Sequence, residues 1–148
     1  MKFYTAYGSN MDLVQMQRRC ENSKFVGTAK INGYRLAFKH SQSGAYSTIE
    51  KSDNHYVPAV VFEISDNDER CLDKYEGYPN FYHKDNMTVE MSDGGKCETM
   101  LYILREDAEF GVPSAIYYDI LARAYCHFNF DFNILSEALH YSYEESYD

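Results

Sequence analysis

The chain has 148 residues, enough for one hydrophobic core, and we expect a single domain over residues 1–148. Its formal net charge is −9 without a basic stripe, so neither nucleic acid nor an anionic membrane surface is expected as a partner. No apolar run reaches the ~18 residues that cross a membrane, and nothing resembles a secretory signal, so we expect a cytoplasmic protein whose four scattered cysteines are free and buried.

The chain opens with a segment rich in β-formers, Lys2–Tyr7, which predicts a strand. Gly8-Ser9-Asn10 interrupts it, and Met11–Cys20 has the composition of a short helix. Ser9 followed by Asp12 matches the S-x-x-D capping pattern at the start of that helix.

Four strands are expected next. Phe25–Ile31 and Tyr34–Lys39 flank Asn32-Gly33, a dipeptide typical of a tight hairpin turn. Ala45–Glu50 and Tyr56–Ile64 follow, and the almost continuous apolar character of the second indicates a central strand.

A helix is predicted to begin at Ser65 or Asp66 and to run to about Glu76, where Gly77 and Pro79 end it. A second hairpin is expected, with strands Tyr82–Met91 and Cys97–Leu104 joined by a turn at Ser92–Gly95. Two helices follow, over Ser114–Tyr125 and Asp131–Tyr143, and Glu144–Asp148 is expected to be a frayed acidic tail. Strands without regular helical crossovers argue against a doubly wound parallel sheet. The order favours an α+β fold with a mixed or antiparallel sheet, closed or nearly closed into a barrel with helices outside.

The carboxylate of Glu76 is the first candidate for catalysis. Leu72 must face the core if the helix is amphipathic, and Glu76 follows it by four residues on the same face. A carboxylate on a half-apolar face loses hydration, which raises its pKa towards the range that suits proton transfer near neutrality. Spacing alone leaves open the alternative of a solvated residue at a frayed helix end.

The loop Tyr7-Gly8-Ser9-Asn10 is the second candidate. Glycine allows the backbone to turn tightly and to approach a ligand, and amide groups at the start of a helix point outwards at the positive end of its dipole. Such a loop can hold a carboxylate or a developing oxyanion. A plain capped turn remains the alternative.

Other chemical patterns are missing from the sequence. The five histidines lack metal-ligand spacing, and there is no G-x-S-x-G, phosphate-binding glycine loop or dinucleotide fingerprint. We therefore expect neither a metal nor a cofactor. Tyr117 and Tyr118 are interpreted as packing residues, with one hydroxyl reaching a pocket.

Two blocks of the chain resemble γ-glutamylcyclotransferase-like (AIG2-like) proteins. The first contains YGSNM at Tyr7–Met11, Met16-x-x-Arg19-Cys20 and GYRLAF at Gly33–Phe38. The second, LDKYEGYP at Leu72–Pro79 with Tyr82 just after it, resembles the family segment that carries the catalytic glutamate before a glycine. The resemblance extends from Phe3 to about Leu104 and becomes looser through the last helices.

The resemblance implies a small mixed β-barrel with peripheral helices and an acyltransferase activity on a γ-glutamyl small molecule. The free α-amine of the substrate attacks its own γ-carbonyl and releases 5-oxoproline and an amine. Glu76 is implied as the acid/base, the loop Tyr7–Asn10 as the holder of the substrate, and Tyr82 and Tyr117 as pocket walls. None of this requires a metal or a cofactor.

Two alternatives remain at this point. The same fold can act as a non-catalytic binder of γ-glutamyl or amino-acid-like metabolites, or its aromatic C-terminal helices can form a protein-interaction surface. The sequence leaves open the leaving amine, the pathway and whether the chain forms a homodimer.

Overall fold

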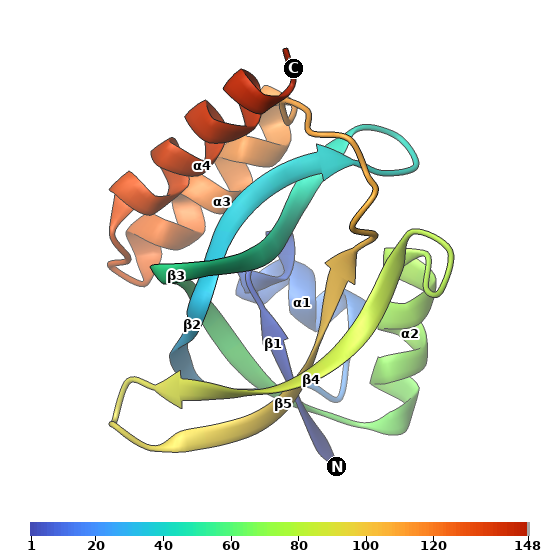
Figure 1. The fold of residues 1–148 in the computed structure, drawn as a ribbon. Coiled ribbons are helices and arrows are strands. Elements are labelled where there is room, and N and C mark those ends of the chain that lie inside the picture. The colour runs from blue at the N-terminus through green and yellow to red at the C-terminus, as the bar shows by residue number, and fades with distance from the viewer. Residues whose placement is uncertain (148) are drawn as a thin grey trace.

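Five strands close into a barrel in the computed structural model, which describes residues 1–147 (Figure 1). The strand order around the barrel is β1-β3-β2-β4-β5, and all contacts are antiparallel except a parallel one between Tyr4 of β1 and Met100 of β5. The expected mixed β-barrel with peripheral helices is confirmed. The elements in chain order are β1 (Lys2–Ala6), the 3-10 helix η1 (Ser9–Met11), α1 (Leu13–Arg19), β2 (Lys24–His40), β3 (Ala45–Ile64), α2 (Asp66–Glu76), β4 (Tyr82–Met91), β5 (Lys96–Leu104), α3 (Ala115–His127) and α4 (Phe132–Glu145).

The predicted hairpin at Asn32-Gly33 is wrong, because two long strands, β2 and β3, replace the four short ones. Gly33 does adopt a positive φ of 80°, but the chain continues in the same direction and pairs with β3 on both sides of it. Asn32 pairs with Tyr56 and Tyr34 pairs with Lys51, so the β3 residues between Lys51 and Tyr56 form a bulge opposite Gly33. The actual turn between β2 and β3 lies at Ser41–Gly44, where the Ser41 amide donates to the Gly44 carbonyl at 2.8 Å.

The start of the first helix also differs from the prediction. Ser9 does not cap it, because Ser9 lies inside η1 and its hydroxyl lies 3.2 Å from the Tyr75 hydroxyl. Asp12 caps α1 instead, accepting from the amides of Val14 and Gln15 at 3.0 and 3.2 Å. The 3-10 turn moves the capping position from Ser9 to Asp12, which frees the Ser9 side chain for a long-range contact.

Helix α2 has the predicted boundaries. Ser65 and Asp68 form a reciprocal capping box, and Gly77 ends the helix in the left-handed conformation with φ of 70°. The predicted hairpin of β4 and β5 and both C-terminal helices are confirmed. The expected frayed tail is shorter than predicted, since α4 runs to Glu145, and Asp148 lies outside the described residues.

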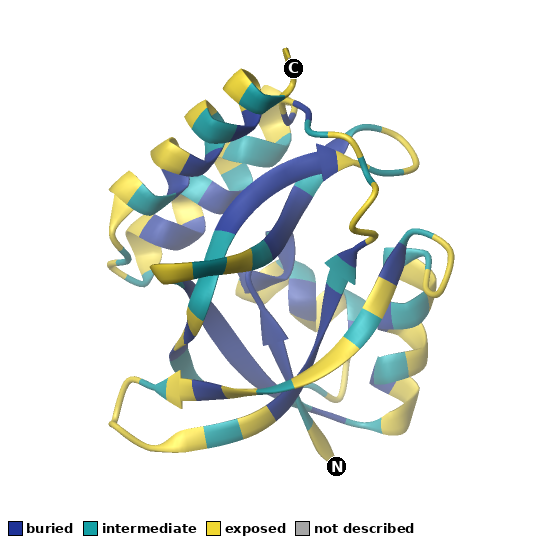
Figure 2. Ribbon diagram, viewed as in Figure 1, coloured by how far each residue is buried: buried dark blue, intermediate teal, exposed yellow. Residues whose placement is uncertain are grey.

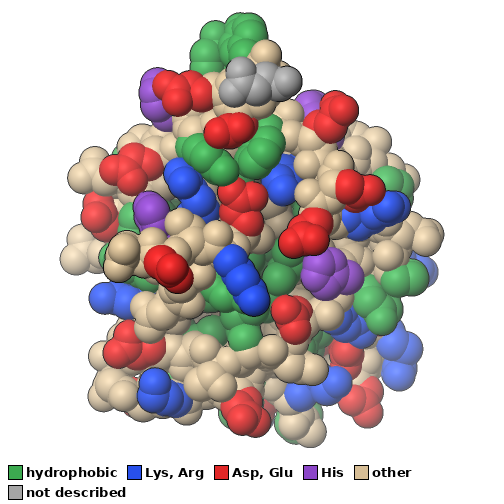
Figure 3. Space-filling model, viewed as in Figure 1, with side chains coloured by type: hydrophobic (Ala, Val, Ile, Leu, Met, Phe, Trp, Pro, Cys, Tyr) green, Lys and Arg blue, Asp and Glu red, His purple; other side chains and the backbone are tan. Residues whose placement is uncertain are grey.

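The buried residues lie along the strands of the barrel and on one face of each of the helices α3 and α4 (Figure 2). Helices α3 and α4 lie side by side, and α4 packs against β2, where the Phe38 amide donates to the Ser142 hydroxyl at 2.8 Å (Figure 1). Within residues 1–147, no helix has the length and apolar character needed to cross a membrane. On the face shown in Figure 3, acidic and basic side chains are interspersed.

All four cysteines are free, but the expectation that they are buried holds only for Cys20, with Cys97 at intermediate exposure. Cys71 and Cys126 are exposed, because they lie on the outer faces of α2 and α3.

Replacing Gly77 with alanine is expected to destabilise the fold more than the same change at Gly94. Both glycines have positive φ, 70° and 94°, which costs a residue with a Cβ roughly 1–2 kcal/mol. A Cβ at position 77 would also lie 2.8 Å from Cδ2 of Phe81, whereas position 94 is open. Urea unfolding of both variants measures the difference, and equal losses of stability would contradict a steric role for Phe81.

Candidate active site

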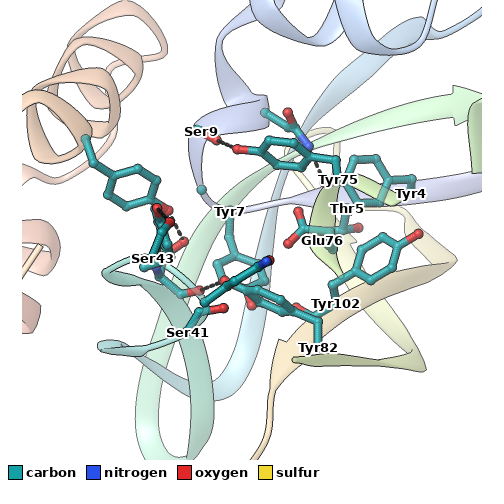
Figure 4. A pocket seen from close by; sticks show the side chains of 16 residues that line it. Tyr4, Thr5, Tyr7, Ser9, Ser41, Ser43, Tyr75, Glu76, Tyr82 and Tyr102 are labelled. Atoms are coloured by element: carbon teal, nitrogen blue, oxygen red, sulfur yellow. Dashed lines mark hydrogen bonds between the residues drawn. The ribbon is translucent and has the colours of Figure 1, made fainter. Parts of the chain in front are cut away.

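A cavity of about 210 Å³ opens where the end of β1, the loop after it, the end of α2 and the turn between β2 and β3 meet (Figure 4). Seven residues singled out in the sequence all line it: Tyr7, Gly8, Ser9, Asn10, Glu76, Tyr82 and Tyr117. They come from the first, middle and last thirds of the chain. The barrel therefore brings both sequence blocks to one place, although the roles of these residues remain predictions.

Two local features direct Glu76 into the cavity. Leu72, one helical turn earlier, is fully buried, so the face that it shares with Glu76 is turned towards the barrel. Gly77 then ends the helix, and its amide bonds back to the carbonyls of Asp73 and Lys74. The Glu76 carboxylate consequently lies among the side chains of Tyr7, Thr5 and Tyr102 (Figure 4).

Burial raises the pKa of Glu76 from its ordinary value of 4.5 to about 7, and the positive charge of Arg19 opposes this shift. No hydrogen bond from residues 1–147 stabilises the ionised carboxylate and so lowers the pKa of Glu76. A carboxyl group with a pKa near neutrality can both accept and return a proton at physiological pH. The surroundings therefore suit Glu76 to general acid/base chemistry.

The loop after β1 offers backbone donors. In the described part of the chain, no acceptor is bonded to the amides of Gly8, Ser9 or Asn10. A Cβ at position 8 would overlap the hydroxyl oxygen of Ser47 and lie 3.1 Å from that of Tyr117, so any other residue here would displace these two hydroxyls. Unpaired amides in a tight loop can bind an anion.

Tyrosine hydroxyls form much of the wall, and protein groups orient them. Tyr7 donates to the carbonyl of Tyr102 at 2.5 Å, and Tyr82 donates to the carbonyl of Ser47 at 3.1 Å. The Tyr117 hydroxyl lies 2.8 Å from the Ser47 hydroxyl and accepts from its amide at 3.2 Å. Burial is the first cause that raises the pKa of Tyr7, Tyr82 and Tyr117, so these walls stay uncharged.

Arg19 connects the loop to the end of α2. Its guanidinium carbon lies 3.4 Å from the centre of the Tyr75 ring, and its Nη1 donates to the side-chain oxygen of Asn10. Asn10 in turn donates to the Tyr4 hydroxyl at 3.1 Å. Arg19 thus holds the loop against the residue that precedes Glu76.

Several lining residues were missed in the sequence because nothing local marks them. Tyr4 and Thr5 lie on β1, Tyr75 precedes Glu76, and Tyr102 lies on β5. The remaining ones belong to the turn between β2 and β3 and to the start of β3, namely Ser41, Gln42, Ser43, Tyr46 and Ser47. The abundance of tyrosine was the one available sign, and it did not distinguish pocket walls from core.

No group of three or more His, Cys, Asp or Glu side chains within residues 1–147 is arranged to hold a metal ion.

Replacing Glu76 with glutamine is expected to stabilise the fold in a pH-dependent way. A raised pKa means that the folded state resists ionisation of Glu76. The free energy of unfolding of the wild type is therefore highest below about pH 4.5 and decreases as the pH rises through about 7. The loss amounts to up to roughly 3 kcal/mol for a shift of this size. Urea unfolding at pH 4 and pH 8 should show equal stability at pH 4 and a more stable variant at pH 8. Glu21→Gln, an exposed control on the surface, should change stability by less than ~0.5 kcal/mol at either pH.

Comparisons with known proteins identify relatives of this chain. The model of a family described as gamma-glutamyl cyclotransferase, AIG2-like, matches residues 4–119. A protein of Methanocaldococcus jannaschii, provisionally named a gamma-glutamylcyclotransferase, is 22% identical over 120 residues, which cover 80% of this chain and 98% of the relative.

Solved structures share the fold. One named gamma-glutamyl cyclotransferase superposes with a TM-score of 0.83 at 22% identity, covering 93% of this chain and 85% of the other. An uncharacterized protein from Homo sapiens also gives 0.83, at 23% identity and the same coverage. YkqA from Bacillus subtilis gives 0.78 at 20% identity, covering 97% of this chain and 55% of the other.

Proposed function

We propose that this chain, which belongs to the gamma-glutamyl cyclotransferase, AIG2-like family, cleaves a γ-glutamyl amide by intramolecular cyclisation. The products are 5-oxoproline and a free amine. One observation carries the proposal: a poorly hydrated Glu76 shares a small cavity with the unpaired amides of Gly8, Ser9 and Asn10. The cavity volume of about 210 Å³ leaves room for a glutamyl fragment.

The reaction needs proton transfer more than it needs a protein nucleophile. The α-nitrogen of the substrate forms a bond to the γ-carbonyl carbon, and the bond from that carbon to the amide nitrogen breaks. Over the whole step the α-ammonium loses two protons and the leaving nitrogen gains two, so no water is consumed. Glu76 can carry both protons in turn, and such catalysis typically contributes ~10²–10⁴-fold.

Geometry supplies the rest of the rate enhancement in this proposal. The nucleophile is tethered to the electrophile, so the pocket has only to select the folded conformer of the substrate. The free amides of the loop are placed to bind the substrate carboxylate or the oxyanion of the tetrahedral intermediate. Neutral hydroxyls of Tyr82 and Tyr117 shape the walls around the folded glutamyl chain.

Glu76→Gln is expected to abolish 5-oxoproline release while the protein stays folded, because glutamine keeps the shape of the side chain but cannot carry a proton. Mass spectrometry of a panel of γ-glutamyl amides measures the product, and Glu21→Gln is the matched control. Retained turnover in Glu76→Gln would show that another group is the acid/base. Binding of these compounds without any product from the wild type would instead favour the non-catalytic binder.

The pH dependence provides a separate test. Glu76 must begin the cycle ionised, so kcat/KM is expected to rise with pH through about 7 and to fall roughly tenfold for each unit below it. Initial rates from pH 5 to pH 8.5 measure the profile. A rate that stays constant over this range would be inconsistent with Glu76 as the general base.

A further inference from the structure

A second cavity, of about 170 Å³, lies between the bulge of β3 and the first two turns of α4. The bulge contributes Asn54, His55 and Tyr56 to its lining. In Figure 1 the bend of β3 lies next to the loop that joins α3 to α4. This cavity shares no lining residue with the cavity around Glu76, so it is a separate place on the molecule.

Two buried side-chain polar atoms within residues 1–147 lack a hydrogen-bond partner, and both are associated with this cavity. They are Nε of Arg35 and the hydroxyl of Tyr125. Arg35 lines the cavity directly. Burial raises the pKa of Tyr125, and the neighbours that raise it further include Tyr56 and Asp131, which both line the cavity. Since a buried polar group without a partner costs free energy, two of them in one region indicate a place for a polar ligand.

The guanidinium of Arg35 is fixed in position but is not neutralised. Its central carbon lies 3.5 Å from the centre of the Tyr141 ring. Glu50, its partner in the strand register, instead accepts from the Tyr141 hydroxyl at 2.6 Å and lies 3.5 Å from the Lys39 ammonium. No carboxylate within residues 1–147 forms an ion pair with Arg35. A stacked arginine of this kind is prepared to bind a carboxylate through two parallel hydrogen bonds.

The opposite charge and an apolar surface are present in the same cavity. Asp131 and Glu137 both line it, and within residues 1–147 neither forms an ion pair. Asp131 uses its carboxylate to cap α4, whereas Glu137 is exposed on the helix. Leu36, Ile134 and Ala138 supply apolar side chains. The lining therefore complements a small molecule that carries both charges and an aliphatic group.

We propose that this cavity binds a free α-amino acid with a small aliphatic side chain. The carboxylate of the amino acid pairs with Arg35, and its ammonium group pairs with Glu137 and Asp131. Its side chain lies against Leu36 and Ile134. A zwitterion has no net charge, so the charge of −9 on the protein does not repel it as it would repel a simple anion. The site is independent of the reaction proposed for Glu76.

L-Valine and two analogues that each lack one of its charges test the inference. Isovalerate lacks the ammonium group and isobutylamine lacks the carboxylate, while the aliphatic part is unchanged. Calorimetry with the full chain should give a Kd for valine of about 1 mM or lower, and binding of either analogue should be at least ~10-fold weaker because a charge-assisted pair is lost. Absence of saturable valine binding, or an analogue that binds as tightly as valine, would overturn the proposal.

Substitutions locate the bound valine. Arg35→Met should weaken valine binding at least ~10-fold, because the carboxylate loses its charged partner. Arg70→Met, at an exposed position of α2, is the matched control and should leave the Kd unchanged. Glu76→Gln should also leave it unchanged, whereas valine bound in the active-site cavity would respond to this variant. Full valine affinity in a folded Arg35→Met protein would refute the site.

Glu137→Gln tests the ammonium end without altering the buried arginine. Glu137 is exposed on α4, so glutamine is not expected to disturb the fold. The preference for valine over isovalerate should fall by about fivefold or more, because only the ammonium group of valine uses this carboxylate. Glu21→Gln, at an exposed position outside this cavity, should leave the preference unchanged. An unaltered preference in Glu137→Gln would contradict the proposed orientation of the amino acid.

Discussion

The candidate site depends on the position of one carboxylate at the end of a helix. Helix α2 is held to the barrel by the fully buried Leu72, and Gly77 ends it before the chain can carry Glu76 into solvent. Burial, with no compensating hydrogen bond from residues 1–147, makes the charged form of this side chain costly, and that cost brings its pKa near neutrality. A residue that weakens the fold at neutral pH is in this way suited to proton transfer.

Holding that carboxylate in place requires contacts on both sides of the cavity. On one side, Arg19 joins the loop after β1 to Tyr75. On the other, Lys84 of β4 pairs with Glu69 at 2.7 Å and with Asp73 at 2.9 Å, two residues on one face of α2. Asp73 also accepts from the Tyr102 hydroxyl at 2.6 Å, so a wall of the cavity is tied to the same helix. Helix and barrel are thus joined through charged groups rather than through packing alone.

The length of β2 and β3 decides the shape of the opening. Because these strands continue through the bulge near Gly33, their turn reaches the edge of the cavity and contributes Ser41–Ser43. The same hairpin places Ser47 against Gly8 and Tyr117, so it joins the first loop to α3. A hairpin that turned at Gly33 would supply neither contact.

Elements governed by neighbouring residues could be predicted from the chain alone. The capping residue Ser65 and the terminating Gly77 defined the bounds of α2, and the four-residue spacing of Leu72 and Glu76 placed the two side chains on one face of it. The turn Ser92–Gly95 likewise predicted the hairpin of β4 and β5. In these cases the local backbone preference and the tertiary arrangement agree, so the local pattern was sufficient.

Other features depended on partners distant in the sequence. Gly33 took the positive φ that a turn would need, but it lies within β2, which pairs with β3 on both sides of it, since continuing the ladder satisfies more backbone groups. Ser9 lost its capping role to Asp12 because its hydroxyl meets Tyr75, far along the chain. The turn residues Ser41–Ser43 line the cavity beside Glu76 and Tyr7 because the closed barrel brings these distant segments together. Local patterns and the family resemblance therefore indicated seven residues that line the cavity, while long-range pairing set the other walls and the opening.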